Sequence, residues 1–158
     1  MYSLKPSIKD DPVSRWNLPD RIFFGHGACH ILAGVFLRKF QRHPFKAVWI
    51  KPIEGYSGNH IFVTDGIRAF DYHGYSLYDN LLRHFEKCWS YKFEGWGAVI
   101  ELVEFDLLDT AALNQRDMRG PDQYLRNPIE RAGKFLGRYE HKYEKTADED
   151  ISYGRLPL

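Results

Sequence analysis

The sequence is poor in the features that mark several large classes of protein. Only two of its 158 residues are cysteines. Cys29 and Cys88 are too few for a disulfide scaffold and lack the paired spacing of a structural zinc site; a single disulfide between them stays open at this point. No apolar run approaches about 18 residues, so no membrane span is predicted. The formal net charge is +1, which provides no general field for a nucleic acid or a membrane surface.

The beginning of the chain lacks the apolar stretch of a signal peptide. Residues 1–12 are polar and include two lysines and two aspartates, so we expect a cytoplasmic protein. The length favours one domain, which we place over 15–143. A flexible arm is expected over 1–14, and a loose polar tail over 144–158.

Hydrophobic periodicity predicts the order of helices and strands. The segment 27–40 carries one apolar stripe at helical spacing, made of Cys29, Leu32, Ala33, Phe36, Leu37 and Phe40. Further along, we expect strands over 46–53 and 97–105, a hairpin over 59–71, and helices over 77–88, 110–118 and 128–143. This order predicts an α+β fold, in which the helix that carries Cys29 packs on a small antiparallel sheet and further helices follow at the C-terminal end.

The predicted hairpin brings together two ionisable side chains. The Asp65-Gly66 step lies between two β-branched and aromatic runs and is typical of a two-residue turn. Counting outward from that turn places His60 directly opposite Asp71, with Cβ atoms about 5 Å apart on one face of the hairpin. An imidazole and a carboxylate on a mostly apolar hairpin are costly to bury without a reason.

Cys29 lies in the first turn of its predicted helix. The first backbone N–H groups of a helix have no partner within it, and with the helix dipole they favour an anion. Both effects lower the pKa of a thiol and raise its thiolate fraction. The same N–H groups can hold the oxyanion of a tetrahedral intermediate. The small residues Gly27 and Ala28 leave room for a substrate beside the sulfur.

Together these residues resemble a known family. Gly27-Ala28-Cys29 at the start of a helix, then His60 on one strand and Asp71 on the next, is similar to the papain-like cysteine-enzyme superfamily. The order of the three resembles most closely its transglutaminase-like and arylamine N-acetyltransferase-like branches and small bacterial proteins of that type, over residues 25–74. The resemblance implies a papain-like core and a hydrolase or acyltransferase that forms an acyl-enzyme on an amide, ester or thioester. Cys29 would be the nucleophile, His60 the base and Asp71 the group that orients the base.

The sequence also departs from papain itself. Phe23 stands where papain has a glutamine, and His30 stands where papain has an aromatic residue. The side chain of the oxyanion hole is therefore unassigned. The candidates for oxyanion or substrate contacts are Asn17, His26, Gly27, Ala28 and Tyr72.

Two other classes of function compete with an acyl-enzyme. His26, Cys29 and His30 form a cluster of zinc-type ligands that His60 or Asp71 would complete in space. A papain-like domain without activity would instead serve as a binding module. In the last predicted helix, basic and aromatic residues alternate in a way that can track single-stranded nucleic acid, but its glutamates favour an ordinary amphipathic helix.

The interpretation that we carry forward is a thiol enzyme without cofactor or metal. Its partner would be a small-molecule or peptide acyl substrate, and neither nucleic acid nor membrane is expected. The sequence does not predict the substrate, the choice between hydrolysis and transfer, or the oligomeric state.

Overall fold

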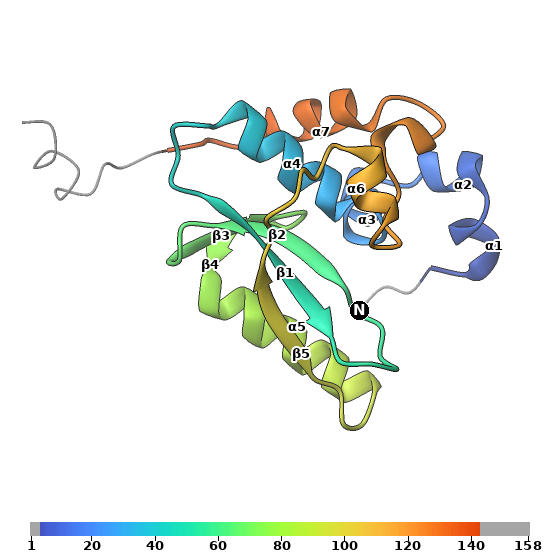
Figure 1. Ribbon diagram of the computed structural model, residues 1–158, viewed down its shortest axis with the longest axis vertical. Helices are drawn as coiled ribbons and strands as arrows, with labels where there is room; N and C mark the ends of the chain where they lie inside the picture. The colour runs from blue at the N-terminus through green and yellow to red at the C-terminus, as the bar shows by residue number, and fades with distance from the viewer. Residues whose placement is uncertain (1–3, 143–158) are drawn as a thin grey trace, which may run out of the picture.

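The computed structural model describes residues 4–142. A five-stranded antiparallel sheet lies at its centre, with strand order β4-β3-β2-β1-β5 (Figure 1). The strands are β1 (Lys46–Pro52), β2 (His60–Thr64), β3 (Arg68–Asp71), β4 (Gly74–Leu77) and β5 (Ala98–Leu102). The predicted α+β class with a small antiparallel sheet is confirmed.

Helices cover both faces of the sheet (Figure 1). One face carries α3 (Asp20–Gly25), α4 (Cys29–Lys39), α6 (Thr110–Asn114) and α7 (Pro128–Leu136), and the other carries α5 (Tyr78–Lys92). Strand β2 contributes to both cores because its side chains alternate: Ile61 and Val63 pack with α4, whereas Phe62 packs with α5. His60 has the same parity as Phe62 and begins the strand.

Helix α4 is the central helix of the larger core. Its apolar stripe buries Leu32 and Phe36 among aromatic and aliphatic side chains from the sheet, α3 and α7. At Gly34, a Cβ atom would meet Leu107 and Leu108 at about 3 Å, so only glycine lets this loop cross the helix so closely. The predicted helix over 27–40 is therefore observed, starting at Cys29.

The register of the β2–β3 hairpin differs from the prediction. Thr64 pairs with Ala69 rather than with Ile67, so the loop between β2 and β3 is longer than the two residues predicted. The loop is closed by the Asp65 side chain, whose Oδ1 accepts hydrogen bonds from the backbone N–H groups of Ile67 at 3.0 Å and Arg68 at 2.7 Å. Because the shift is two residues, every side chain keeps its predicted face.

The segment after the hairpin is another strand. Residues 74–77 form β4, paired with β3, so α5 begins at Tyr78, close to the start at residue 77 that the sequence predicted. Gly74 follows a tight turn with φ of +96°, a conformation that suits glycine. At the other end, α7 starts at Pro128 as predicted, and Asn127 caps it, but the helix ends at Leu136 rather than at residue 143.

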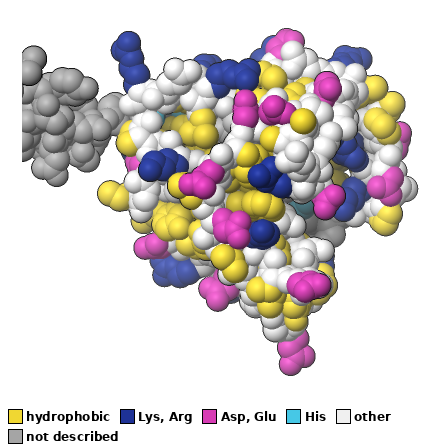
Figure 2. All heavy atoms as spheres, viewed as in Figure 1, with side chains coloured by type: hydrophobic (Ala, Val, Ile, Leu, Met, Phe, Trp, Pro, Cys, Tyr) yellow, Lys and Arg dark blue, Asp and Glu magenta, His cyan; other side chains and the backbone are white. Residues whose placement is uncertain are grey.

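The N-terminal segment predicted as a flexible arm contains two short helices. They are α1 (Pro6–Lys9) and α2 (Pro12–Trp16), and Asp11 caps the second by accepting from the backbone N–H of Ser14 at 3.0 Å. Residues 1–3 and the predicted tail over 144–158 lie outside the described residues. Within the described chain, no helix is long and apolar enough to span a membrane. On the face shown in Figure 2, cationic and anionic side chains are interspersed.

Candidate active site

The start of α4 lies beside the start of β2. Cys29 is the first residue of the helix and is half-buried. Its Sγ accepts a hydrogen bond from the backbone N–H of Ile61 at 3.5 Å. Ala28, at the cap position, is fully buried and makes no side-chain cap. The sulfur therefore lies where the free N–H groups of the helix and one N–H of the sheet favour negative charge.

His60 and Asp71 form a buried pair next to this thiol. His60 Nε2 lies 3.0 Å from Asp71 Oδ2 and donates to it, and the residues are 1% and 3% exposed. The imidazole is sandwiched by aromatic rings, parallel to Phe85 at 4.4 Å and edge-on to Tyr72 at 5.5 Å between ring centroids. These contacts fix the orientation of the ring. The sequence prediction that His60 and Asp71 lie side by side agrees with this geometry.

The bond to Asp71 determines which ring nitrogen of His60 is left for the thiol. Since Nε2 donates to the carboxylate, Nδ1 is the remaining nitrogen. Nδ1 is buried and has no hydrogen bond of standard geometry within residues 4–142. His60 and Cys29 are nevertheless close enough to shift each other's pKa, and hydrogen bonds between base and nucleophile are often long before substrate binds.

The three groups change one another's protonation. Burial alone would raise the pKa of the Cys29 thiol, but hydrogen bonding with His30 and His60 and the positive charge of these rings outweigh burial and lower it to about 5. Burial alone would lower the pKa of His60, but Asp71 and Cys29 raise it to about 9. Asp71 is buried too, yet its two histidine partners hold the pKa of its carboxyl group well below the usual range. At neutral pH the arrangement therefore favours a thiolate beside an imidazolium.

His30 is a second imidazole next to the sulfur. It is buried, and its Nε2 donates to the backbone carbonyl of Arg119 at 2.8 Å. From the sequence, His30 was a possible metal ligand and a departure from papain, and its place beside the sulfur was not predicted. The signal was its position directly after the cysteine in the first turn of a helix.

Asp71 also contacts a second histidine. Its Oδ1 accepts from the backbone N–H of His73 at 2.8 Å and lies 3.2 Å from the Nδ1 atom of the same residue. The tight turn between β3 and β4 places His73 there. Asp71 is thus held from two sides, which fixes the oxygen that faces His60.

A cavity of about 270 Å³ opens at the sulfur. His26, Gly27, Cys29, His30 and His60 line one side of it. Its remaining lining residues are Lys9, Asp10, Arg15, Trp49, Asn59, Ile61, Asp117, Met118 and Arg119. The cavity gives a small molecule or a side chain access to the thiol.

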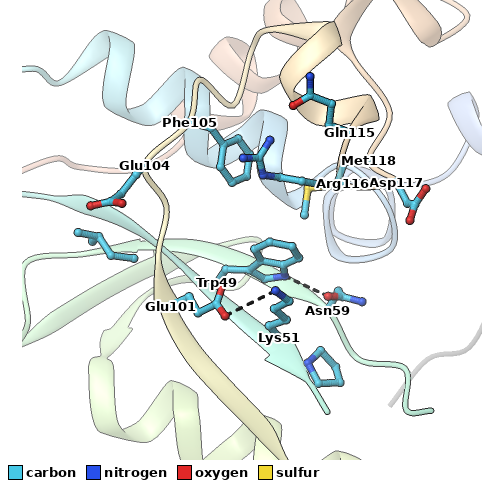
Figure 3. A pocket seen from close by; sticks show the side chains of 12 residues that line it. Trp49, Lys51, Asn59, Glu101, Glu104, Phe105, Gln115, Arg116, Asp117 and Met118 are labelled. Atoms are coloured by element: carbon cyan, nitrogen blue, oxygen red, sulfur yellow. Dashed lines mark hydrogen bonds and ion pairs between the residues drawn. The ribbon is translucent and has the colours of Figure 1, made fainter. Parts of the chain in front are cut away.

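This cavity adjoins a larger groove of about 770 Å³ (Figure 3). Trp49 and Asn59 line both, and the Trp49 indole donates to Asn59 Oδ1 at 3.0 Å. In the groove, Lys51 lies 3.5 Å from Glu101, and the Arg116 guanidinium stacks over the Phe105 ring at 3.8 Å. The residues that follow α6 form the opposite wall (Figure 3). A ligand at Cys29 that is longer than the cavity would extend into this groove.

Of the remaining candidates for oxyanion or substrate contacts, some lie near Cys29 and one does not. Gly27 lies at the cavity with φ of +132°, and its carbonyl accepts from the Tyr124 hydroxyl at 2.7 Å. His26 also lines the cavity, and burial lowers its pKa. Tyr72 packs against the ring of His60. Asn17 is exposed at the end of α2 and does not line the cavity, so the structure does not bring it to Cys29.

The arrangement does not favour the metal site. In the described part of the chain, no group of three histidine, cysteine or acidic side chains is placed to hold a metal ion. His30 uses Nε2 as a hydrogen-bond donor to Arg119. The two cysteines are free, and Cys88 on α5 contacts His84 instead. Comparisons with protein-family models, curated proteins and solved structures find no match for this chain.

Proposed function

We propose that the protein is a thiol-dependent hydrolase or acyltransferase that forms an acyl-enzyme on Cys29. The observation that carries this proposal is the placement of His60. Its ring is buried and held by Asp71 on one side, and it acts on the Cys29 thiol on the other. Nucleophile, base and orienting carboxylate are thus connected in one line, the arrangement needed for nucleophilic catalysis.

In the first step, the Cys29 thiolate attacks the carbonyl carbon of an amide, ester or thioester. The electron pair of the carbonyl moves to its oxygen, which the free N–H groups at the start of α4 can hold. As the tetrahedral intermediate collapses, the bond to the leaving group breaks and the His60 imidazolium donates its proton to that group. The acyl chain remains on Cys29 as a thioester.

In the second step, water or an amine attacks the thioester. Neutral His60 accepts the proton of the incoming nucleophile, and Asp71 stabilises the imidazolium that forms. The thiolate leaves and is stabilised again by the imidazolium and by the Ile61 N–H. The chemistry is the same for hydrolysis and for transfer, and the entering nucleophile decides between them.

The fold supports a papain-like relationship as part of this proposal. A cysteine at the start of the central helix, followed by a histidine and an aspartate on neighbouring strands, is the order that the sequence resemblance implied. The structure adds that helix and sheet meet at these three residues. We propose a papain-like core on this basis.

Trapping of the acyl-enzyme tests the proposal. The protein is incubated with a panel of aryl esters and alkyl thioesters, quenched in acid, digested and analysed by mass spectrometry. We expect an acyl adduct on the peptide that contains Cys29, absent in Cys29→Ala and reduced in His60→Ala. Adducts only on other residues, or equal adducts in Cys29→Ala, would refute the assignment.

A further inference from the structure

Arg15 is a buried cation on the wall of the Cys29 cavity. Arg15 is only 8% exposed and lies on the short helix α2. Within residues 4–142, the hydrogen bond found for its guanidinium is from Nη2 to the backbone carbonyl of Lys9. A guanidinium carries five N–H donors in a planar fork, so one carbonyl satisfies only part of it.

Arg119 lines the same cavity. Its backbone carbonyl accepts from His30, while its guanidinium lies 5.9 Å from the centre of the Tyr124 ring. Arg15 and Arg119 also share the wall of a small adjoining cavity of about 50 Å³. Two arginines from distant parts of the sequence therefore line the same two cavities.

Neither arginine has an ion pair with a carboxylate within the described residues. The two acidic residues on the cavity wall, Asp10 and Asp117, are exposed and form no ion pair with them. The contrast is Arg131, which bonds Asp20 at 2.8 Å and two backbone carbonyls. Among the described residues, Arg131 thus has a carboxylate partner, and the two cavity arginines have none.

Arg15 is buried and Arg119 is partly buried, and a charge that has lost water is stabilised by gaining a counter-charge. The favourable partner for an arginine fork is a carboxylate or a phosphate, which it binds through two parallel hydrogen bonds. Within residues 4–142 no such group pairs with either arginine, so a bound anion would supply one. The same cavity also contains the nucleophile, so the anion and the reacting carbonyl would belong to one molecule.

We infer that the acyl substrate of Cys29 carries an anionic group, a carboxylate or a phosphate, which Arg15 and Arg119 bind beside the reacting carbonyl. This inference rests on the proposed function and adds the substrate class. Lys9 at the rim of the cavity adds positive charge. Composition could not reveal this site, since the net charge of the chain is only +1.

Paired alkylating reagents test the inference without knowledge of the natural substrate. N-iodoacetylglycine and N-iodoacetylaminomethylphosphonate carry a carboxylate and a phosphonate, and N-iodoacetylglycinamide is their neutral counterpart. Rates are measured at Cys29 and Cys88 of the same sample by mass spectrometry, and each anionic rate is divided by the neutral rate. Cys88 supplies the intrinsic preference of a thiol outside the cavity.

We expect the ratio at Cys29 to exceed that at Cys88 by about tenfold for at least one anionic reagent, and the better reagent identifies the anion. Arg15→Gln and Arg119→Gln should each lower the ratio at Cys29 by about threefold or more. Arg83→Gln, an exposed arginine on α5, is the matched control and should leave it unchanged. Circular dichroism checks that each variant is folded. If Arg15→Gln does not fold, the ratio measured at Cys29 of the wild-type protein still tests the inference.

Two results would overturn the inference. Equal ratios at Cys29 and Cys88 in the wild-type protein would show that the cavity does not prefer anions. A high ratio that persists in folded Arg15→Gln and Arg119→Gln would assign the preference to the imidazolium of His60 instead. The proposed function fails differently: the neutral reagent would then alkylate Cys29 no faster than Cys88, whatever the ratios.

Discussion

His60 on β2 and Asp71 on β3 are diagonal neighbours in the sheet and form a hydrogen bond. Thr64 pairs with Ala69, so Asp71 comes level with Phe62 and His60 lies two residues beyond. The two side chains still meet, with His60 Nε2 3.0 Å from Asp71 Oδ2, because diagonal neighbours on one face remain within reach of a long side chain. The diagonal places the imidazole past the end of the β2–β3 pairing, where the start of α4 brings Cys29.

Cys29 should be the more reactive of the two cysteines. Near neutral pH, we expect iodoacetamide to alkylate Cys29 much faster than Cys88, because the thiolate fraction controls the rate and the neighbouring imidazoles lower the pKa of Cys29 to about 5. Limited labelling followed by peptide mass spectrometry measures both sites at once. Equal labelling, or faster labelling of Cys88, would contradict the assignment.

Asp71→Asn should reduce the reactivity of Cys29 while the protein stays folded. The variant keeps the shape of the side chain but removes the charge that helps to raise the pKa of His60. A weaker imidazolium raises the pKa of the thiol, and each unit of that rise lowers the thiolate fraction about tenfold at a pH below the pKa. The measurement is the alkylation rate at slightly acidic pH.

The matched control is Asp65→Asn in the same hairpin. Asp65 closes the loop through Ile67 and Arg68 and does not contact His60. We expect this variant to lose some stability and to keep the wild-type reactivity of Cys29. If both variants slow alkylation equally, the effect comes from a general loosening of the hairpin.

Cys29→Ala should change the free energy of unfolding by less than about 1 kcal/mol, since surroundings shaped for a substrate are seldom optimised for stability. Cys29 is half-buried, and the backbone N–H of Ile61 donates a long hydrogen bond of 3.5 Å to its sulfur. Ile31→Ala, two residues along the same helix and fully buried, should cost about 2–5 kcal/mol. Urea unfolding compares the variants. A large loss in Cys29→Ala, without any change in acylation, would favour a purely structural cysteine.

The Asp71 carboxylate should stabilise the fold in a defined pH range. Its pKa is lowered in the folded state, so its contribution is complete above the unfolded-state pKa of about 3.9 and is lost as the pH falls through the lower folded value. We expect the stability difference between wild type and Asp71→Asn to be largest above about pH 4 and to shrink in acid. Urea unfolding between neutral and strongly acidic pH measures it; a difference that does not vary with pH would contradict the shift.

Patterns local in sequence predicted much of the fold. The helix that begins at Cys29 followed from its apolar stripe, and the faces of the hairpin followed from strand alternation, which a two-residue shift leaves intact. The exact register did not follow. It depends on the Asp65 side chain, which bonds two backbone N–H groups and makes the longer loop stable. Strand β4 was not predicted, because it is only four residues long and lies between the predicted hairpin and the predicted helix, where the chain turns back at Gly74.

Counting from the turn predicted that His60 and Asp71 share one face of the hairpin, and the structure brings them together. Cys29 was proposed from its place at the start of a helix and from the family resemblance, whereas His30, His73 and the cavity arginines are brought in by tertiary contacts. Arg119, for example, reaches the cavity through a turn with no periodic signal, and its carbonyl is identified as the partner of His30 only in three dimensions. Asn17, chosen for its chemistry alone, lies on the exposed end of a short helix.

The most direct test of the account is the titration of the Cys29 thiolate. Its ultraviolet absorbance is followed as the difference between wild type and Cys29→Ala across the pH range, so that tyrosines and Cys88 cancel. If the thiolate pairs with the His60 imidazolium, the midpoint of the titration should lie at about pH 5. A midpoint near the ordinary thiol value of about 8.5 would show that His60 does not activate Cys29.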